Sequence, residues 1–308
     1  MPTSPPDVSP GVPSIGWRAL LALLARLPQP VLSRGLGRIA DLRIPRPMRR
    51  TILGRFARAA GIDLTEAERP LEDYVSINAL FVRRLRPGLR HWPDHPDHAG
   101  SPVDGIVGAF GHVRHGIAIQ AKGRSYAIAD LLDDRAAATR YHDGAFLTLY
   151  LSPRHYHRIH APCDATIQHA THVPGALLPV NAPAVTHIDA LFPRNERVIT
   201  YLDSRLGRIA VVAVGAYNVG RISVAFDLEW NGPRGHVANR PDPPPRSRTY
   251  LPPLPIDRGE ELMAFHLGST VVLLFEHARA DLVAKLRTGD ELRLGHVIAT
   301  AANANSPM

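Results

Sequence analysis

The sequence has very little cysteine and very little lysine. Its 308 residues include one cysteine, Cys163, so a disulfide within the chain and a metal site with several cysteine ligands are both excluded. A reducing compartment is the simplest setting for such a chain. Lys122 and Lys285 are its two lysines, and an enzyme that uses a lysine Schiff base would depend on one of them. This scarcity favours a carbonyl group from another source.

Long apolar runs are also missing. The longest one near the start, residues 19–25, is too short to span a bilayer. No basic stretch precedes an apolar core in the first residues, so we expect no secretory signal. Aromatic residues make up 6% of the chain, but hydrophobic residues reach 45%, which is enough for a substantial core.

Positive charge is concentrated at the N-terminus. Residues 1–60 hold ten arginines and two aspartates, which accounts for the whole net charge of +8. A nucleic-acid surface would extend over more of the chain, so we expect no nucleic-acid partner.

The N-terminal third has a helical pattern. Residues 1–14 are rich in Pro and Ser and predict a flexible tail, and amphipathic, Arg-rich helices are expected at 16–27, 30–42 and 48–60, the last closed by Gly61. Another helix is expected over 72–85. Short helices of this composition are typical of a membrane interface, where arginines meet anionic headgroups. A helical cap on the core is the alternative, and an arm for nucleic acid is a weaker one.

After about residue 101 the pattern changes to short β-branched runs separated by Gly, Pro, Asn and Asp. Strands are expected at 105–108, 117–120, 146–151, 208–214, 222–226 and 271–275, and an exposed loop at 231–255. We therefore predict an α+β protein: a tail (1–14), a helical, membrane-interacting segment (15–90) and a β-rich catalytic domain (91–308).

Three histidines, His155, His157 and His160, lie close together in the segment YLSPRHYHRIH (residues 150–160). Such clusters serve acid–base chemistry or metal binding. A metal would need further ligands such as His142 or His169, and the helical HExxH signature is missing, so we expect no metal.

Two other short segments are ordinary turns when taken alone. Asp104 lies in SPVDG (101–105), and Ser269 lies in LGST (267–270) ahead of an apolar strand. A serine after glycine can attack the preceding carbonyl, since Gly268 offers little steric hindrance. The segment is not a GxSxG nucleophile elbow. GLGRIA (35–40) matches a nucleotide-binding pattern but follows no strand, so we dismiss it.

In their order, these segments resemble the phosphatidylserine decarboxylases, a pyruvoyl-dependent, self-processing family of prokaryotic type. The resemblance extends from about residue 74 to the C-terminus and rests on INALFVRRLRP (77–87), SPVDG (101–105), QAKG (120–123), YLSPRHYHRIH (150–160), VPG (173–175), VN (180–181), LFPRNERV (191–198), VGAYNVG (214–220) and LGST (267–270). The chain departs from the family pattern at His155, where Asp is usual, at Ala165, where Gly is common, and at 262–264.

The resemblance implies a mechanism. Asp104, His160 and Ser269 match the family's self-processing triad, and His157 matches the histidine linked to decarboxylation. Cleavage between Gly268 and Ser269 would give chains 1–268 and 269–308, held together as a heterodimer that can dimerise further. Ser269 would become a pyruvoyl group, which forms a Schiff base with phosphatidylserine and yields phosphatidylethanolamine.

The same resemblance implies a peripheral membrane protein on the cytoplasmic face of the cell membrane, bound to an anionic bilayer surface. Three alternatives stay open at the level of sequence. They are a lipid-directed serine hydrolase that uses the same three residues uncut, a histidine-ligated metal hydrolase, and a non-catalytic membrane-interaction module.

Overall fold

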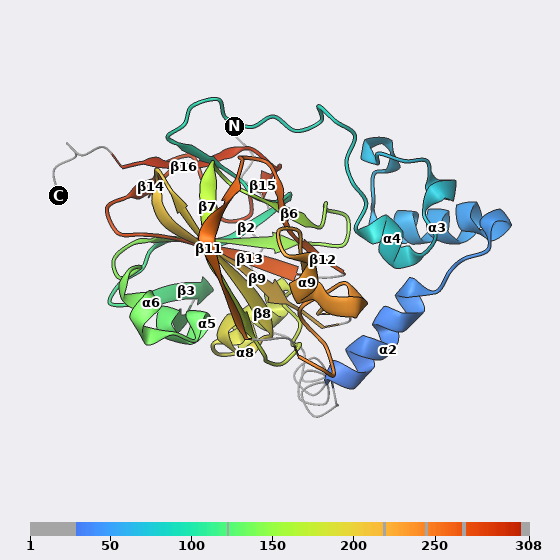
Figure 1. Ribbon diagram of the computed structural model, residues 1–308, viewed down its shortest axis with the longest axis horizontal. Coiled ribbons are helices and arrows are strands. Elements are labelled where there is room, and N and C mark those ends of the chain that lie inside the picture. The colour runs from blue at the N-terminus through green and yellow to red at the C-terminus, as the bar shows by residue number, and fades with distance from the viewer. Residues whose placement is uncertain (1–28, 122, 218–219, 244–245, 267–268, 303–308) are drawn as a thin grey trace, which may run out of the picture.

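The computed structural model describes residues 29–302 apart from 122, 218–219, 244–245 and 267–268. The predicted tail at 1–14, the predicted helix at 16–27 and Gly268 lie outside the described residues. Helices precede a β-rich body, and the mixture of helix and large antiparallel sheets confirms the predicted α+β class (Figure 1).

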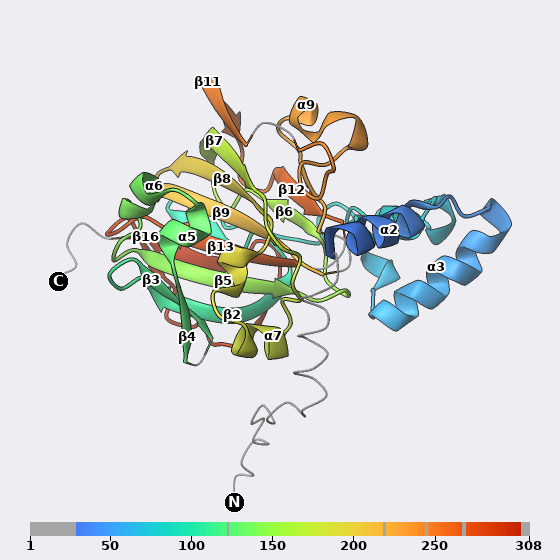
Figure 2. The ribbon, with the colours of Figure 1, turned by 90° about the horizontal axis from the view of Figure 1, so that it is seen from below.

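The N-terminal segment contains α2 (Gln29–Asp41), α3 (Arg46–Ala60) and α4 (Ile77–Phe81), with short 3₁₀ turns η1 (Leu64–Glu66) and η2 (Leu71–Asp73). In both ribbon views α2 and α3 lie on one flank of the strands (Figures 1 and 2). α3 ends at Gly61, whose φ of 71° suits a residue without a side chain. A small core of its own, which includes Leu53, Ala57 and Leu80, holds the segment together.

One predicted helix is wrong. Residues 72–85 form η2 and the five-residue α4 in place of a long helix. Ser76 starts α4 anew, because its hydroxyl accepts a hydrogen bond from the backbone N–H of Ala79 at 3.1 Å. The chain then leaves helical geometry, because Arg84 C=O accepts from Glu68 N–H at 2.9 Å. A long-range backbone contact has overridden the local helical pattern.

An eight-stranded antiparallel sheet forms the centre of the body, with the strand order β11-β7-β8-β9-β13-β5-β2-β15. Its strands are β2 (Gly105–His112), β5 (Ala145–Leu151), β7 (Ala165–Val173), β8 (Arg197–Ser204), β9 (Gly207–Gly215), β11 (Ser247–Ile256), β13 (Ser269–Phe275) and β15 (Glu291–Leu292).

Three smaller sheets and several short helices surround this sheet. The smaller sheets are β10 (Ile222–Val224)-β12 (Glu261–Phe265)-β6 (Arg158–His160), β1 (His98–Gly100)-β16 (Val297–Ala301)-β14 (Ala280–Leu282) and β3 (Ile117–Ala121)-β4 (Arg124–Ala127). The short helices are α5 (Ile128–Leu132), α6 (Arg135–Thr139), α7 (Ala182–His187), α8 (Leu191–Arg194), α9 (Leu228–Asn231) and η3 (Gly232–Arg234).

The body has a hydrophobic core on each face of the large sheet. Successive side chains of a strand point to opposite faces, and β13 follows this rule. Val271 and Leu273 belong to the core that includes the small β6 and β12 strands, whereas Val272 and Leu274 belong to the other core, under α5 and α8. β13 is therefore buried on both faces.

The six strands expected from sequence are all present as β2, β3, β5, β9, β10 and β13. The loop expected at 231–255 is partly wrong, because residues from Ser247 onward form β11, which pairs with β7. The division of the chain at residue 90 stays a prediction. None of the helices in the described part of the chain is long and apolar enough to cross a membrane.

Candidate active site

Ser269 is the first residue of β13, which lies in the middle of the large sheet. It pairs with Leu151 of β5 on one side and with Gly215 of β9 on the other. Its side chain is fully buried, and its hydroxyl has no hydrogen-bond partner among the described residues. Because an unsatisfied buried hydroxyl costs about 1–3 kcal/mol, this position works against stability, as expected of a group kept for chemistry.

His157 directly precedes β6 and is also fully buried. Its Nδ1–H donates to the backbone carbonyl of His155 at 2.9 Å, which places the lone pair of the neutral ring on Nε2. Nε2 has no partner among the described residues. Burial lowers the pKa of His157 to about 3, so the ring is neutral at neutral pH. In this state Nε2 can accept a proton.

The position of His157 is fixed by two neighbouring elements. The ring of Phe81, at the end of α4, lies with its centroid 3.9 Å from the imidazole centroid. The backbone carbonyl of His157 accepts a hydrogen bond from Phe265 N–H at 2.9 Å. β12, which ends at Phe265, leads directly toward Ser269, so His157 is tied to the segment that precedes the serine.

His160 is the last residue of β6. Its Nδ1–H donates to the carbonyl of Gly259 at 2.7 Å, and its Nε2 accepts from the hydroxyl of Tyr156 at 3.1 Å. Burial lowers the pKa of His160, so this ring is also neutral and its Nε2 has the lone pair of a base. Sequence reasoning did not identify Tyr156 as a partner of this histidine.

Asp104 lies in the turn between β1 and β2, and its carboxylate is held by Arg90. Arg90 donates from Nε to Oδ1 at 3.0 Å and from Nη2 to Oδ2 at 2.6 Å. Leu294 N–H donates a third hydrogen bond to Oδ1 at 2.7 Å. Arg90 also contacts Glu66, with Nη2 2.8 Å from Oε2. Burial alone would lower the pKa of Arg90, but the hydrogen bonds to Asp104 and Glu66 outweigh it and raise that pKa.

The structure brings the predicted residues into one region without joining them as a hydrogen-bonded triad. The turn of Asp104 is attached to β6, because His160 N–H donates to Pro102 C=O at 2.9 Å. The hydrogen bonds of the described residues do not include one between the side chains of Asp104 and His160, or between His160 and Ser269. Arg90 occupies the carboxylate, and the Gly259 carbonyl holds His160 in the tautomer that Asp104 was expected to fix.

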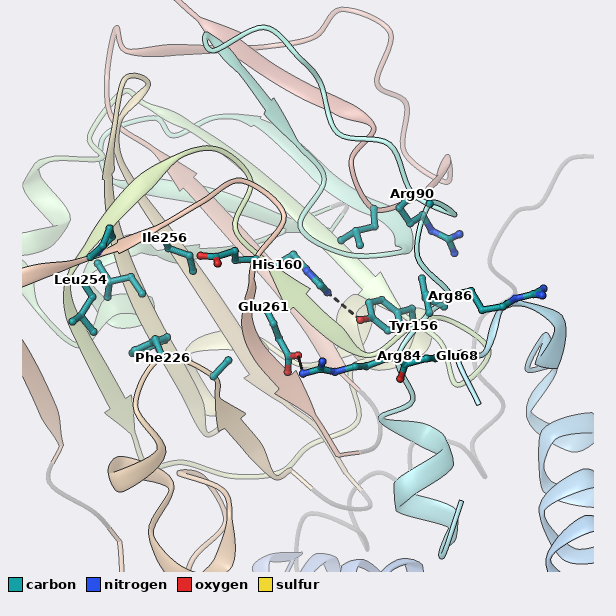
Figure 3. A pocket seen from close by; sticks show the side chains of 17 residues that line it. Glu68, Arg84, Arg86, Arg90, Tyr156, His160, Phe226, Leu254, Ile256 and Glu261 are labelled. Atoms are coloured by element: carbon teal, nitrogen blue, oxygen red, sulfur yellow. Dashed lines mark hydrogen bonds and ion pairs between the residues drawn. The ribbon is translucent and has the colours of Figure 1, made fainter. Parts of the chain in front are cut away.

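A cavity of about 700 Å³ opens beside His160 and Tyr156, between the N-terminal segment and the strands. Figure 3 shows its mixed character: Arg84 and Glu261 form an ion pair at 3.3 Å, while Phe226, Leu254 and Ile256 form an apolar wall. Its lining includes neither His157 nor Ser269, so in the described state Ser269 is closed off from this cavity.

A second cavity, of about 650 Å³, lies beside Thr270, the residue after Ser269. It is mostly apolar, with lining that includes Ile106, Phe110, Ile119, Tyr150, Val180 and Phe192. Both cavities fall in the range of roughly 300–1,000 Å³ that is common for small-molecule sites. Among the described residues there is no group of three His, Cys, Asp or Glu side chains arranged to hold a metal ion.

The chain was compared with known proteins. A family model described as phosphatidylserine decarboxylase matches residues 77–300. That span is more than half of the chain and contains Asp104, His157, His160 and Ser269. The chain belongs to the phosphatidylserine decarboxylase family.

Several relatives in this family carry the name phosphatidylserine decarboxylase proenzyme. The chain is 42% identical to the one from Anaeromyxobacter sp. (strain K) over 285 residues, which is 92% of this chain and 99% of that protein. It is 39% identical to the Myxococcus xanthus protein over 278 residues, 90% and 96% of the two chains. The Brevibacillus brevis protein is 35% identical over 294 residues, 93% and 99%.

Membership of the phosphatidylserine decarboxylase family makes the chain an enzyme, a decarboxylase, and confirms the resemblance found in its motifs. The match to the family model begins at Ile77, the first residue of α4. This helix ends at Phe81, whose ring contacts the ring of His157. The motif around residues 77–83 was noticed in the sequence, but its contact with His157 was not. Arg90 and Glu66 were missed, because no local pattern distinguishes them from surface residues. Tyr156 lies in the 150–160 motif, but its hydrogen bond to His160 was not foreseen.

Proposed function

We propose that the chain cleaves itself between Gly268 and Ser269, converts Ser269 into a pyruvoyl group, and then decarboxylates phosphatidylserine to phosphatidylethanolamine. One observation carries the proposal: β13 begins with a fully buried serine whose hydroxyl has no hydrogen-bond partner among the described residues. Two neutral histidines lie on or beside β6, which pairs with the strand leading to that serine. The names of the relatives, which describe proenzymes, support the same reading.

Self-cleavage needs a base for the Ser269 hydroxyl, and we assign this role to His160 with Asp104 as its acidic partner. The alkoxide attacks the Gly268 carbonyl, and the acyl group moves from nitrogen to oxygen. β-Elimination of that ester breaks the Cβ–O bond and releases Gly268 as a carboxylate. Tautomerisation and hydrolysis then release ammonia and leave a ketone next to the amide of Thr270. In the described structure the Tyr156 hydroxyl donates a hydrogen bond to Nε2 of His160, the proposed base. Arg90 donates to the carboxylate of Asp104, the proposed acidic partner.

The small chain, 269–308, would stay bound after cleavage. Every residue of β13 is buried, and the strand pairs with β5 and β9 along its whole length. The apolar and backbone contacts of β13 do not depend on the bond before it. We therefore propose that the mature enzyme is a heterodimer of the two chains.

The burial of Ser269 suits a pyruvoyl precursor, because a reactive ketone is best kept from bulk water. When formed, the group supplies an electron sink for loss of CO₂ from an amine-bearing carboxylate. His157 is the proposed proton donor to the substrate carbon. It is neutral in the uncut chain, so it must gain a proton, which requires that cleavage reduce its burial.

A phospholipid substrate is supported by two features. The apolar cavity beside Thr270 suits a hydrocarbon chain. α2 packs its small residues Ser33, Gly37 and Ala40 inward and exposes Leu36 and Ile39, and Leu42, directly after the helix, continues the exposed row. Ile39 and Leu42 are 60% and 63% exposed. This reverses the usual orientation of an amphipathic helix and suits insertion of the apolar row into a bilayer.

We further propose a peripheral membrane protein on the cytoplasmic face, whose arginines contact anionic lipids. Activity is tested with vesicles that contain carboxyl-labelled phosphatidylserine. The unaltered protein should release labelled CO₂, and Ser269→Ala should release none and stay a single chain. Ser125→Ala, at an exposed serine of β4, is the matched control and should behave like the unaltered protein. An uncut chain that releases CO₂ or hydrolyses lipid esters would contradict the proposal.

A further inference from the structure

A third cavity, of about 220 Å³, lies where α2 meets the loop after α9. Four of its lining residues are arginines: Arg34 and Arg38 of α2, Arg221 before β10, and Arg234 of η3. The one acidic residue in the lining is Asp41. The cavity is smaller than sites for drug-sized ligands, so it suits a single headgroup-sized ion.

The arginines are only partly neutralised by acidic side chains. Asp41 pairs with Arg221, with Oδ2 2.6 Å from Nη1, and the exposed Asp242 pairs with Arg234 at 3.3 Å. The side chains of Arg34 and Arg38 form no hydrogen bond or ion pair with another residue in the described part of the chain. Two unpaired guanidinium groups facing one cavity favour a phosphate-type oxyanion, because the planar fork of each matches phosphate geometry.

The positive charge of this cavity does not come from a histidine. His236 also lines the cavity, and burial lowers its pKa to about 4, so it is neutral at neutral pH. Its Nδ1–H donates to the backbone carbonyl of Ala238 at 2.7 Å. The positive charge for an anion therefore comes from the arginines, and the affinity for a phosphodiester should vary little with pH above about 5.

The position of the cavity connects it to two features of the proposed site. The backbone carbonyl of Arg221 accepts a hydrogen bond from His266 N–H at 3.0 Å, and His266 stands two residues before Gly268. α2, which supplies Arg34 and Arg38, exposes Leu36 and Ile39 on its other side. The anion site is thus placed between an apolar row suited to a bilayer and the segment that leads to the cleavage site.

We infer that this arginine cavity binds the phosphate group of a phospholipid headgroup. The inference rests on the proposed function only in taking a phospholipid as the source of the phosphate. The shared chemistry, an oxyanion held by guanidinium groups, could also come from free phosphate, and the experiment separates these two sources.

Binding is measured by calorimetric titration of the uncut Ser269→Ala chain with glycerophosphoserine, inorganic phosphate and free serine. Glycerophosphoserine carries the headgroup phosphate without acyl chains. In that background the variant Arg34→Gln/Arg38→Gln should bind glycerophosphoserine at least tenfold more weakly, since each lost charged hydrogen bond is worth about that factor. Free serine should bind equally to both proteins.

Arg114→Gln/Arg135→Gln is the matched control, because both arginines are exposed and the change in charge is the same. It should change the affinity for glycerophosphoserine less than twofold. Arg34→Lys/Arg38→Lys keeps the charge and loses the planar fork, so it should give an intermediate loss. Equal affinity in the Gln variant and the control would overturn the inference. Binding of inorganic phosphate without glycerophosphoserine would overturn the lipid source.

This readout needs neither cleavage nor decarboxylation. If the unaltered protein released no CO₂ while the arginine variants lost affinity, the proposed function would fail and the anion site would stand. If CO₂ release occurred and all variants bound glycerophosphoserine equally, the anion site would fail and the proposed function would stand.

Discussion

Arg90 and Asp104 face each other through two parallel hydrogen bonds, Nε to Oδ1 at 3.0 Å and Nη2 to Oδ2 at 2.6 Å. The side chain of Arg90 is 7% exposed, and it also forms hydrogen bonds with Glu66 of η1 and with the Leu89 carbonyl. One buried cation thus joins the helical segment to the turn that carries a proposed catalytic acid.

The first prediction concerns this ion pair. Arg90→Met leaves the buried Asp104 carboxylate without its cation, and leaves the half-buried Glu66 with only the longer contact to Arg293 at 3.7 Å, so stability should fall by about 3–5 kcal/mol. Arg84→Met is the control, because Arg84 is largely exposed and its pair with Glu261 should contribute about 1 kcal/mol or less. Urea unfolding in the Ser269→Ala background measures both. Similar losses in the two variants would mean that Arg90 does not hold the turn.

The second prediction separates the two histidines. His157→Gln should cleave nearly as well as the unaltered protein but lose at least tenfold in decarboxylation, because a general acid contributes about 10²–10⁴ to a rate. His160→Gln should remain uncut. His277→Gln, at an exposed histidine, is the control and should cleave and decarboxylate like the unaltered protein. Gel densitometry gives the cut fraction, and CO₂ release is normalised to it. Equal loss of cleavage and decarboxylation in His157→Gln would refute this division of roles.

The third prediction concerns stability and pH. Burial lowers the pKa of His157 and of His266 to about 3, against 6.5 for an exposed histidine. Between these values the unfolded chain binds more protons than the folded chain. The stability that comes from keeping the rings neutral is therefore complete above about pH 6.5 and is lost as the pH falls toward 3, by at most about 1.4 kcal/mol per pH unit for each ring.

Urea unfolding of the Ser269→Ala chain at several pH values between about 7 and 5 measures this loss. His157→Gln should have a shallower slope, because it lacks one of the buried rings whose pKa is lowered. His277→Gln, whose ring is exposed, should keep the original slope. A stability that is flat over this range would show that the rings are not held neutral by burial.

The fourth prediction concerns the apolar row formed by Leu36 and Ile39 of α2 and by Leu42 directly after it. Leu36→Ser/Ile39→Ser/Leu42→Ser should weaken binding to anionic vesicles at least tenfold, because each large side chain is worth about 1.5–3 kcal/mol when fully buried. The matched control is Ile117→Ser/Leu251→Ser/Val297→Ser, which changes three exposed apolar residues elsewhere in the chain. Vesicle sedimentation measures both at low salt. Unchanged binding of the α2 variant would remove the interfacial role of this helix.

The sequence predicted those parts of the fold that depend on local pattern. The β13 strand could be recognised because five apolar residues follow Thr270, and α3 because a left-handed Gly61 closes an Arg-rich helix. β11 was missed, since its prolines suggest a loop and only pairing with β7 orders it. The helix expected over 72–85 was interrupted by the pairing of Glu68 with Arg84, which no window of sequence contains.

The candidate site divides in the same way. Ser269, His157, His160 and Asp104 stand in motifs and could be named from sequence. Their partners could not. Arg90 contacts Asp104 across 14 residues, and His160 contacts Gly259 across 99. These hydrogen bonds join residues that are far apart in the sequence. Only the structure therefore identifies the hydrogen-bond partners of Asp104 and His160.

The central claim is that Ser269 becomes the catalytic carbonyl by self-cleavage. Its most direct test is the intact mass of the purified, denatured protein. Two chains are predicted, 1–268 and 269–308. The small chain should be lighter by one molecule of ammonia than a chain that begins with serine, and its N-terminus should be blocked to sequential degradation. A single uncut chain that still releases CO₂ from phosphatidylserine would contradict the claim, and so would an active small chain that begins with an intact serine.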